Sequence, residues 1–293
     1  MSKSSMQKFT VKDFQKIFPD DNACLEYIRQ QKYPERIDCP QCKKNALFHK
    51  ITERKSYACD YCGYQIAPMA GTIFEKSSTQ LTLWFYVIYL MAQTRGGISA
   101  KQIERETGVT YKTAWRMCKE IRHCLSENHS PFDGDVELDE SYFGGISKGK
   151  RGRGADNKIP VFGIAQRDGK VKVTVVPNVR RPSIMPIVEN YVLEGTRVYT
   201  DEMRTYNILP SMGYKHSNVP HALKIYVIGN THTNTIEGFW SNVKNGIRGV
   251  YHYVSPRYLQ SYLNEYSFRY NHRKDTNPMF WSFLRRSVFH RAS

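Results

Sequence analysis

The segment VELDESYFGG, residues 136–145, combines the alternation of a β-strand with acids inside the strand. Val136 and Leu138 fall on one face of this predicted strand, whereas Glu137 and Asp139 share the other face. A carboxylate within a strand is costly unless it binds a metal or a cation. The segment therefore predicts an α/β domain in which Asp139 is functional, with Glu137 as a weaker candidate.

The residues after this strand predict a mixed sheet flanked by helices. PVFGIAQRDGKVKVTVVPN, residues 160–178, is typical of a β-hairpin that turns at Asp168 and Gly169. A helix is expected over 183–193, and TRVYTD at 196–201 predicts a further strand. The order strand, hairpin, helix and strand is the order of a ribonuclease-H-like core.

Two further acids stand where such a core would bring carboxylates together. Asp201 ends its strand at the C-terminal edge, where α/β sheets collect ligands. Glu237 lies in HTNTIEGFWSNVK, residues 232–244, which predicts an amphipathic helix. Taken singly, Asp139 is typical of a salt-bridge partner, Asp201 of a helix N-cap and Glu237 of a solvated helix acid. As an ordered triad they favour a site for two Mg²⁺ or Mn²⁺ ions.

Basic residues follow on the helix that carries Glu237. Lys244 lies two helical turns after Glu237, so it shares that face and is expected to steer a phosphate without binding metal. Arg248 is close behind and is a DNA-contact candidate. Glu140 alternates to the face opposite the predicted site.

Four of the seven cysteines form two CxxC pairs, Cys39 with Cys42 and Cys59 with Cys62. Each pair makes a tight turn, so the four thiolates are expected to meet tetrahedrally around one Zn²⁺. A four-cysteine site has no open coordination position, which indicates a structural role. The sequence leaves open whether this zinc ribbon touches DNA or another protein.

Residues 98–125, ISAKQIERETGVTYKTAWRMCKEIRHCL, have the form of two helices joined at Gly108. Thr110 is expected to cap the second helix. A helix-turn-helix presents the start of its second helix to base edges. The residues predicted to contact DNA there are Lys112, Thr113 and Arg116. The alternative is an ordinary helical hairpin between domains.

The chain carries 43 Lys and Arg against 27 Asp and Glu, a net charge of +16, which favours a polyanionic partner, foremost nucleic acid. An evenly solvated basic surface would have the same composition, so the motifs must decide, and with them the expected partner is double-stranded DNA. The Gly- and Lys/Arg-rich segment 147–158 predicts a basic DNA-contact loop, and Arg269 and Arg273 are further charge-based candidates. The candidates in the loop are Lys148, Lys150, Arg151 and Arg153. No apolar run is long enough to span a bilayer, so a cytoplasmic protein is expected.

Composition changes divide the chain into four expected parts. These are a helical lead-in (1–33), a zinc ribbon (34–75), a helix-turn-helix region (76–130) and a ribonuclease-H-like catalytic domain (131–293).

Together the motifs resemble bacterial insertion-sequence transposases of the DDE class, which carry an N-terminal zinc ribbon and a retroviral-integrase-like core. The resemblance covers nearly the whole chain. It rests on CPQC, CDYCGYQI, GTIFEKSSTQLTLWF, LDESYFGG, YTDE and the long stretch HTNTIEGFWSNVKNGIRGVYHYVSPRYLQSYLNEYSFRYNHR. It implies Mg²⁺-dependent cleavage at element ends and strand transfer into target DNA, by Asp139, Asp201 and an acid on the following helix. Because two DNA ends must be held at once, a dimer or larger homo-oligomer is expected.

The third ligand position has two candidates in this chain, since parts of the family carry asparagine there. Glu237 fits better, because its seven-residue distance to Lys244 is the family's spacing of acid and lysine. Asn234, one turn earlier on the same face, is expected to orient Glu237 or to bind a metal-bound water. The alternative functions are a non-catalytic DNA-binding regulator and, third, a stand-alone nuclease.

Overall fold

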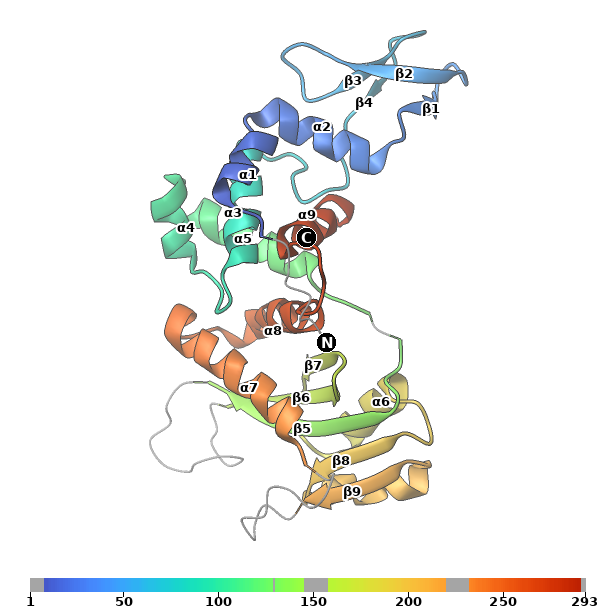
Figure 1. The fold of residues 1–293 in the computed structure, drawn as a ribbon, viewed down its shortest axis with the longest axis vertical. Coiled ribbons are helices and arrows are strands. Elements are labelled where there is room, and N and C mark those ends of the chain that lie inside the picture. The colour runs from blue at the N-terminus through green and yellow to red at the C-terminus, as the bar shows by residue number, and fades with distance from the viewer. Residues whose placement is uncertain (1–7, 129, 145–157, 220–231, 291–293) are drawn as a thin grey trace. The chain divides into compact units, whose positions relative to one another are not determined.

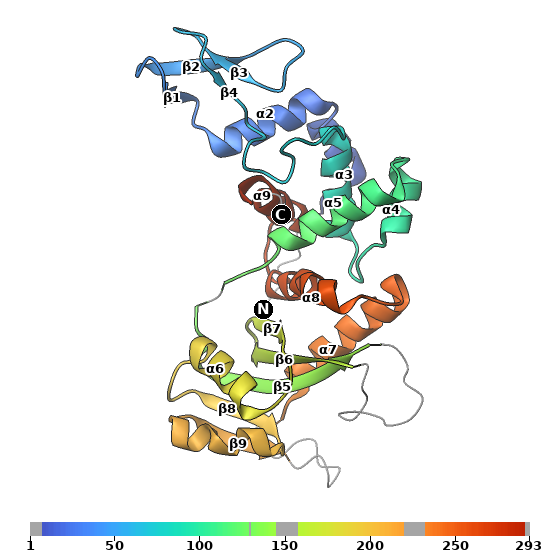
Figure 2. The same ribbon diagram turned by 180° about the vertical axis from the view of Figure 1, so that it is seen from behind.

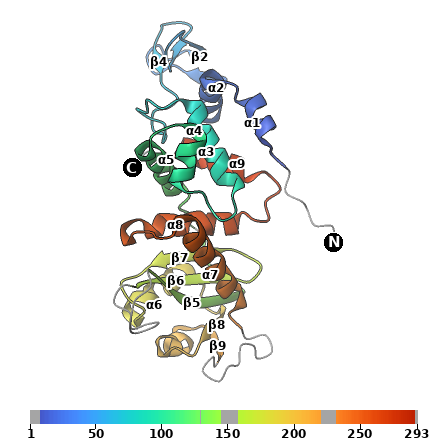
Figure 3. The same cartoon turned by 90° about the vertical axis from the view of Figure 1, so that its left-hand side faces the viewer.

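The structure is a computed structural model that describes residues 8–128, 130–144, 158–219 and 232–290 (Figure 1). The chain forms two compact units, Ser126–Arg273 and a first unit that joins Met1–Leu125 to Lys274–Ser293. Figures 2 and 3 show the same ribbon from behind and from the side.

The first unit begins with two capped helices and a small sheet. The Thr10 side chain caps α1 (Val11–Ile17) in a capping box, and the Asp20 side chain caps α2 (Asp21–Lys32). The sheet is antiparallel in the order β1-β2-β3-β4. Its strands are β1 (Arg36–Asp38), β2 (Asn45–Lys50), β3 (Tyr57–Cys59) and β4 (Gln65–Ile66).

Four more helices complete the first unit. They are α3 (Leu81–Gln93), α4 (Ala100–Thr107), α5 (Tyr111–Cys124) and the C-terminal α9 (Met279–Phe289), which packs on α2, α3 and α5. Within the described ranges, no helix is long and apolar enough to cross a membrane.

The position of α9 differs from the expected domain division, which placed residues 274–293 with the catalytic domain. Phe280, Phe283 and Leu284 of α9 are fully buried, and the Phe280 ring stacks on Phe9 at 4.8 Å. These apolar side chains therefore assign the end of the chain to the first unit.

The second unit is built on a five-stranded mixed sheet in the order β7-β6-β5-β8-β9 (Figure 1). Strand β5 pairs antiparallel with β6 and parallel with β8. The outer pairs are antiparallel for β6 with β7 and parallel for β8 with β9. The bounds are β5 (Asp135–Phe143), β6 (Ile159–Gln166), β7 (Val171–Val175), β8 (Arg197–Asp201) and β9 (Lys215–Val219).

Helices cover both faces of this sheet. One face packs against α6 (Arg181–Tyr191) and the 3₁₀ segment η2 (Arg204–Met212). The other packs against α7 (Asn234–Gly246), the π-helix η4 (Ile247–Tyr251) and α8 (Pro256–Asn271). Val136 and Leu138 of β5 belong to the core between the sheet and α6 with η2. The predicted alternation is therefore confirmed, as is the hairpin at Asp168, which has a φ of 55°.

Candidate active site and zinc centre

Asp139 lies within β5, on the face of the sheet that α7 covers. Burial raises the pKa of its carboxyl well above the usual range, and the negative charges of Glu140, Asp201 and Glu237 raise it further. Asp201 and Glu237 are thus both close enough to Asp139 for their charges to act on it. Such a group of carboxylates is stabilised by a bound cation.

The other two acids come from the expected elements. Asp201 is the last residue of β8, and its Oδ1 accepts a hydrogen bond of 2.9 Å from the amide of Met203. That bond forms a tight turn, whereas the N-cap residue of η2 is Met203 itself. Glu237 is exposed in the first turn of α7, where its Oε1 accepts a 2.6 Å bond from the Thr233 hydroxyl.

The three acids do not form a tight cluster. Among the described residues, the only group of three or more acids, histidines or cysteines with ligand atoms all within 4.8 Å of one another is the cysteine quartet.

Trp240 and Gly163 belong to the site, although the sequence analysis did not single them out. The Trp240 indole donates a 3.1 Å hydrogen bond from Nε1 to Oδ2 of Asp139. Gly163 pairs with Asp139 across β5 and β6. A Cβ at Gly163 would lie 2.5 Å from the Trp240 ring, so glycine is what lets the indole reach the acid. A lone glycine inside a predicted strand is a signal of such close approach.

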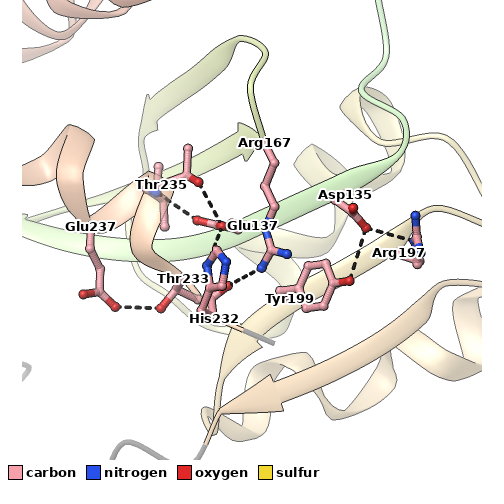
Figure 4. Close-up of polar contacts among 10 residues, drawn as sticks. Asp135, Glu137, Arg167, Arg197, Tyr199, His232, Thr233, Thr235 and Glu237 are labelled. Atoms are coloured by element: carbon pink, nitrogen blue, oxygen red, sulfur yellow. Dashed lines mark hydrogen bonds and ion pairs between the residues drawn. The ribbon is translucent and has the colours of Figure 1, made fainter. Parts of the chain in front are cut away.

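Glu137 lies on the same face of β5 as Asp139, as predicted. Its carboxylate accepts hydrogen bonds from the start of α7 (Figure 4). Its carboxylate is fully buried and accepts a 2.8 Å bond from Arg167 Nε. It also accepts 3.0 Å bonds from the Thr235 hydroxyl and the Ile236 amide, and His232 Nδ1 lies 3.3 Å away. With these partners Glu137 positions the helix.

Arg167 strengthens this attachment (Figure 4). Its Nη2 donates a 2.8 Å bond to the His232 carbonyl, and its guanidinium lies 4.0 Å from the centre of the Tyr199 ring on β8. The Glu137–Arg167 pair therefore links β5 and β8 to the residues just before Glu237. No local sequence pattern indicates this pairing, because the partners are about 30 to 100 residues apart.

Two polar residues lie outside this group of acids. Glu140 points to the opposite face, as predicted, where its Oε2 accepts a 3.0 Å bond from the Tyr206 hydroxyl. Asn234 is exposed at the start of α7, and no described residue hydrogen-bonds its side chain. Nothing in the described chain links Asn234 to Glu237.

Lys244 lies two turns after Glu237 on α7. Burial lowers the pKa of its ammonium group, Asp139 raises that pKa, and the neighbouring Arg248 and Lys158 lower it. The lysine is therefore within electrostatic reach of both Asp139 and a group of cations.

The cysteines form a compact site in the first unit. Cys39 and Cys62 have sulfurs 3.6 Å apart, and those of Cys42 and Cys59 are 3.9 Å apart. Four sulfurs at about 2.3 Å from zinc would lie about 3.8 Å from one another. The residues present therefore fit a structural zinc ion, and all four donors are used.

Backbone turns shape this site. Gly63 has a φ of 73°, and its amide donates a 3.0 Å bond to the Cys59 carbonyl. Lys43 takes the equivalent conformation after the first pair, with a φ of 61° and a 2.9 Å bond to the Cys39 carbonyl. The two CxxC turns are thus built alike, as their spacing predicts.

The two predicted helices joined at Gly108 are present, and Gly108 has a φ of 71°. Of the residues predicted to contact DNA there, Lys112 is exposed. The Thr113 amide donates to the N-cap Thr110. Arg116 is exposed, and its guanidinium stays within hydrogen-bond distance of the Ser77 hydroxyl at 3.3 Å.

The remaining charge-based candidates divide into two groups. Arg269 forms a 2.7 Å salt bridge with the buried Glu265, and Arg273 donates a 2.9 Å bond to the Gly169 carbonyl. Both guanidinium groups thus make contacts inside the second unit. The other candidates, Lys148, Lys150, Arg151 and Arg153, lie outside the described residues.

The first unit contains a zinc site, and the second contains a mixed sheet that carries the acids. Together they define a metalloprotein of two parts, and each part matches a known protein family. Residues 131–271 match the ISXO2-like transposase domain, and residues 19–65 match the transposase zinc-ribbon domain. The chain therefore contains two domains of insertion-sequence transposases, the ISXO2-like transposase domain and the transposase zinc ribbon.

Two relatives agree with this assignment. An uncharacterized protein in transposable element ISH50 of Halobacterium salinarum is 28% identical over 273 residues, which cover 87% of this chain and 92% of the relative. An uncharacterized transposase-like protein of Haemophilus influenzae is 28% identical over 102 residues, 35% of this chain and 81% of the relative.

Proposed function

We propose that this transposase cuts DNA at the ends of a mobile element and joins the freed ends to target DNA. The observation that carries the proposal is the placement of Asp139 in β5 beneath Trp240 of α7, with Asp201 at the end of β8 and Glu237 in the first turn of α7. The charges of Asp201 and Glu237 also raise the pKa of Asp139. The sheet order also supports the proposal. Among the described strands of this sheet, only β6, the second along the chain, runs antiparallel to the central β5, as in a ribonuclease-H-like core.

The proposed ligands of the catalytic ions are Asp139, Asp201 and Glu237. Bound Mg²⁺ would supply charge neutralisation at phosphorus and a lowered pKa for the attacking water or hydroxyl. The protein's own share is to hold the acids in place. Trp240 orients one oxygen of Asp139, and Glu137 anchors the start of the Glu237 helix. Lys244 meets the negative charge of the phosphate.

DNA is the proposed substrate and partner, and two copies or more of the chain are expected to hold the two ends. The net charge of +16 supports binding to a polyanion. The zinc ribbon supports the first unit structurally, and the helix pair with exposed Lys112 is a candidate for reading the element end.

A strand-joining assay tests the proposal. The protein is incubated with pre-cleaved element-end DNA, plasmid target and Mg²⁺, and joined products are resolved on a gel. We expect joining by the natural protein and none by Asp139→Asn or Asp201→Asn. Cleavage without joining would indicate a stand-alone nuclease, and DNA binding with neither activity would indicate a regulator.

The same assay decides the third ligand. We expect Glu237→Gln to abolish joining and Asn234→Ala to keep most of it. The reverse result would assign the position to Asn234.

A further inference from the structure

A pocket in the second unit brings together cations that the proposed chemistry does not fully use. It has a volume of about 60 Å³ and lies between the ends of β5 and α7 and the start of α8. Lys158, Lys244 and Arg248 line it, together with Tyr253. The described residues lining this pocket include no acid.

In the part of the chain that the structure describes, Lys158, Lys244 and Arg248 make no salt bridge. Burial is the largest cause of the lowered pKa of Lys244, and the charges of Arg248 and Lys158 lower that pKa further. The charge of Asp139 raises it. A pocket with an uncompensated positive charge favours a bound anion.

The backbone that forms the rim is strained. The end of α7 runs into the π-helix Ile247–Tyr251, and His252 follows with φ 59° and ψ −47°. The amide of Tyr253 donates a 2.6 Å bond to the Tyr251 carbonyl, which closes a rare γ-turn around His252. Strain of this kind is concentrated at functional sites.

This turn places an aromatic side chain beside the cations. Tyr253 is 62% exposed, the largest exposed fraction among the large apolar and aromatic residues described. An exposed ring next to a cationic pocket is the arrangement that proteins use to hold an unpaired base by stacking and its phosphate by charge. The pocket volume corresponds to about five waters, which suits a phosphate group and excludes a base from the interior.

We propose that this pocket is a nucleotide subsite, in which Lys158 and Arg248 hold the phosphate next to the reacting one and Tyr253 stacks on its unpaired base. Lys244 lines the pocket and interacts electrostatically with Asp139, so it lies between the subsite and the acids. The inference rests on the proposed function for its biological substrate, but DNA binding in the pocket does not require catalysis. It can therefore be measured without Mg²⁺.

Binding of a twelve-nucleotide thymidine strand to the full zinc-loaded chain, followed by fluorescence anisotropy over a salt series, tests the charge component. We expect Lys158→Ala and Arg248→Ala each to weaken binding about tenfold. Each should also reduce the slope of log K against log salt by about 0.7, the value for one lost phosphate contact on single strands. Arg181→Ala is the matched control, since Arg181 is exposed on α6 at the other face of the sheet.

Photocrosslinking tests the aromatic component, with 5-iododeoxyuridine replacing one thymidine. We expect a crosslink at Tyr253 that is lost in Tyr253→Leu, while Tyr253→Trp retains binding and Arg181→Ala keeps the crosslink. Salt slopes equal to those of Arg181→Ala, or crosslinks only outside the pocket, would overturn the subsite. Loss of strand joining with these binding results intact would count against the proposed function alone.

Discussion

The indole Nε1 of Trp240 donates a hydrogen bond across 3.1 Å to Oδ2 of Asp139, and this contact ties α7 to the central strand at the site itself. Trp240 also lies one turn after Glu237 on α7. The orientation of one proposed ligand is therefore set by the helix that carries another.

Replacing the indole while keeping an aromatic ring tests this contact. Trp240→Phe removes the donor, and we expect strand joining to fall about 10- to 100-fold, the usual cost of losing a group that orients a metal ligand. The loss should be partly recovered at high Mg²⁺. Trp281→Phe in the first unit is the control, and equal effects of the two substitutions would remove Trp240 from the site.

Gly163→Ala tests why glycine occupies the middle of β6. The new Cβ would lie 2.5 Å from the Trp240 ring, so we expect a loss of about 1–3 kcal/mol in the free energy of unfolding, together with weaker strand joining. Gly238→Ala on α7 is the matched control. A Cβ there meets nothing within 4 Å, and alanine favours the helix, so its stability should hold or rise. Urea denaturation measures both.

Glu137→Gln tests the anchor of α7 against an ion pair of similar burial. We expect both Glu137→Gln and Glu265→Gln to cost about 3–5 kcal/mol of unfolding free energy, because each leaves a largely buried arginine without its carboxylate. Only Glu137→Gln should raise the Mg²⁺ concentration needed for half-maximal joining. An equal shift in both variants would mean that Glu137 contributes stability without positioning the site.

Asp139→Asn should stabilise the metal-free protein at neutral pH. Because the folded pKa of Asp139 is raised, its ionisation opposes folding above that pKa, and the penalty disappears as pH falls towards the unfolded value of about 3.9. We therefore expect a higher melting temperature for the variant at pH 8 without Mg²⁺ and a smaller difference at pH 5. Mg²⁺ should raise the melting temperature of the natural protein alone. A destabilised variant at pH 8 would contradict this view.

Much of the second unit could be predicted because local signals agree with the fold. Alternation in 136–143 gave the faces of β5, and Asp168 with Gly169 gave the hairpin. The spacing of the cysteines predicted a four-cysteine metal site, and the four sulfurs do lie close together. These features depend on neighbours in sequence, which is where pattern reasoning is strongest.

The features that were missed depend on distant partners. Glu137 was weighed as a metal ligand, yet its partners Arg167 and Thr235 come from other elements, so its structural role could not be read from the strand. The position of α9 in the first unit is similar, since an apolar helix pattern does not say which core it joins. Trp240 left only the indirect signal of Gly163.

The central claim is that Asp139, Asp201 and Glu237 jointly hold the catalytic ions. Mn²⁺ binding to the zinc-loaded chain, followed by electron paramagnetic resonance, tests it most directly. We expect the natural protein to bind Mn²⁺, and Asp139→Asn, Asp201→Asn and Glu237→Gln each to weaken that binding strongly, while Asn234→Ala leaves it near the natural level. Unchanged Mn²⁺ binding in any of the three acid variants would contradict the account.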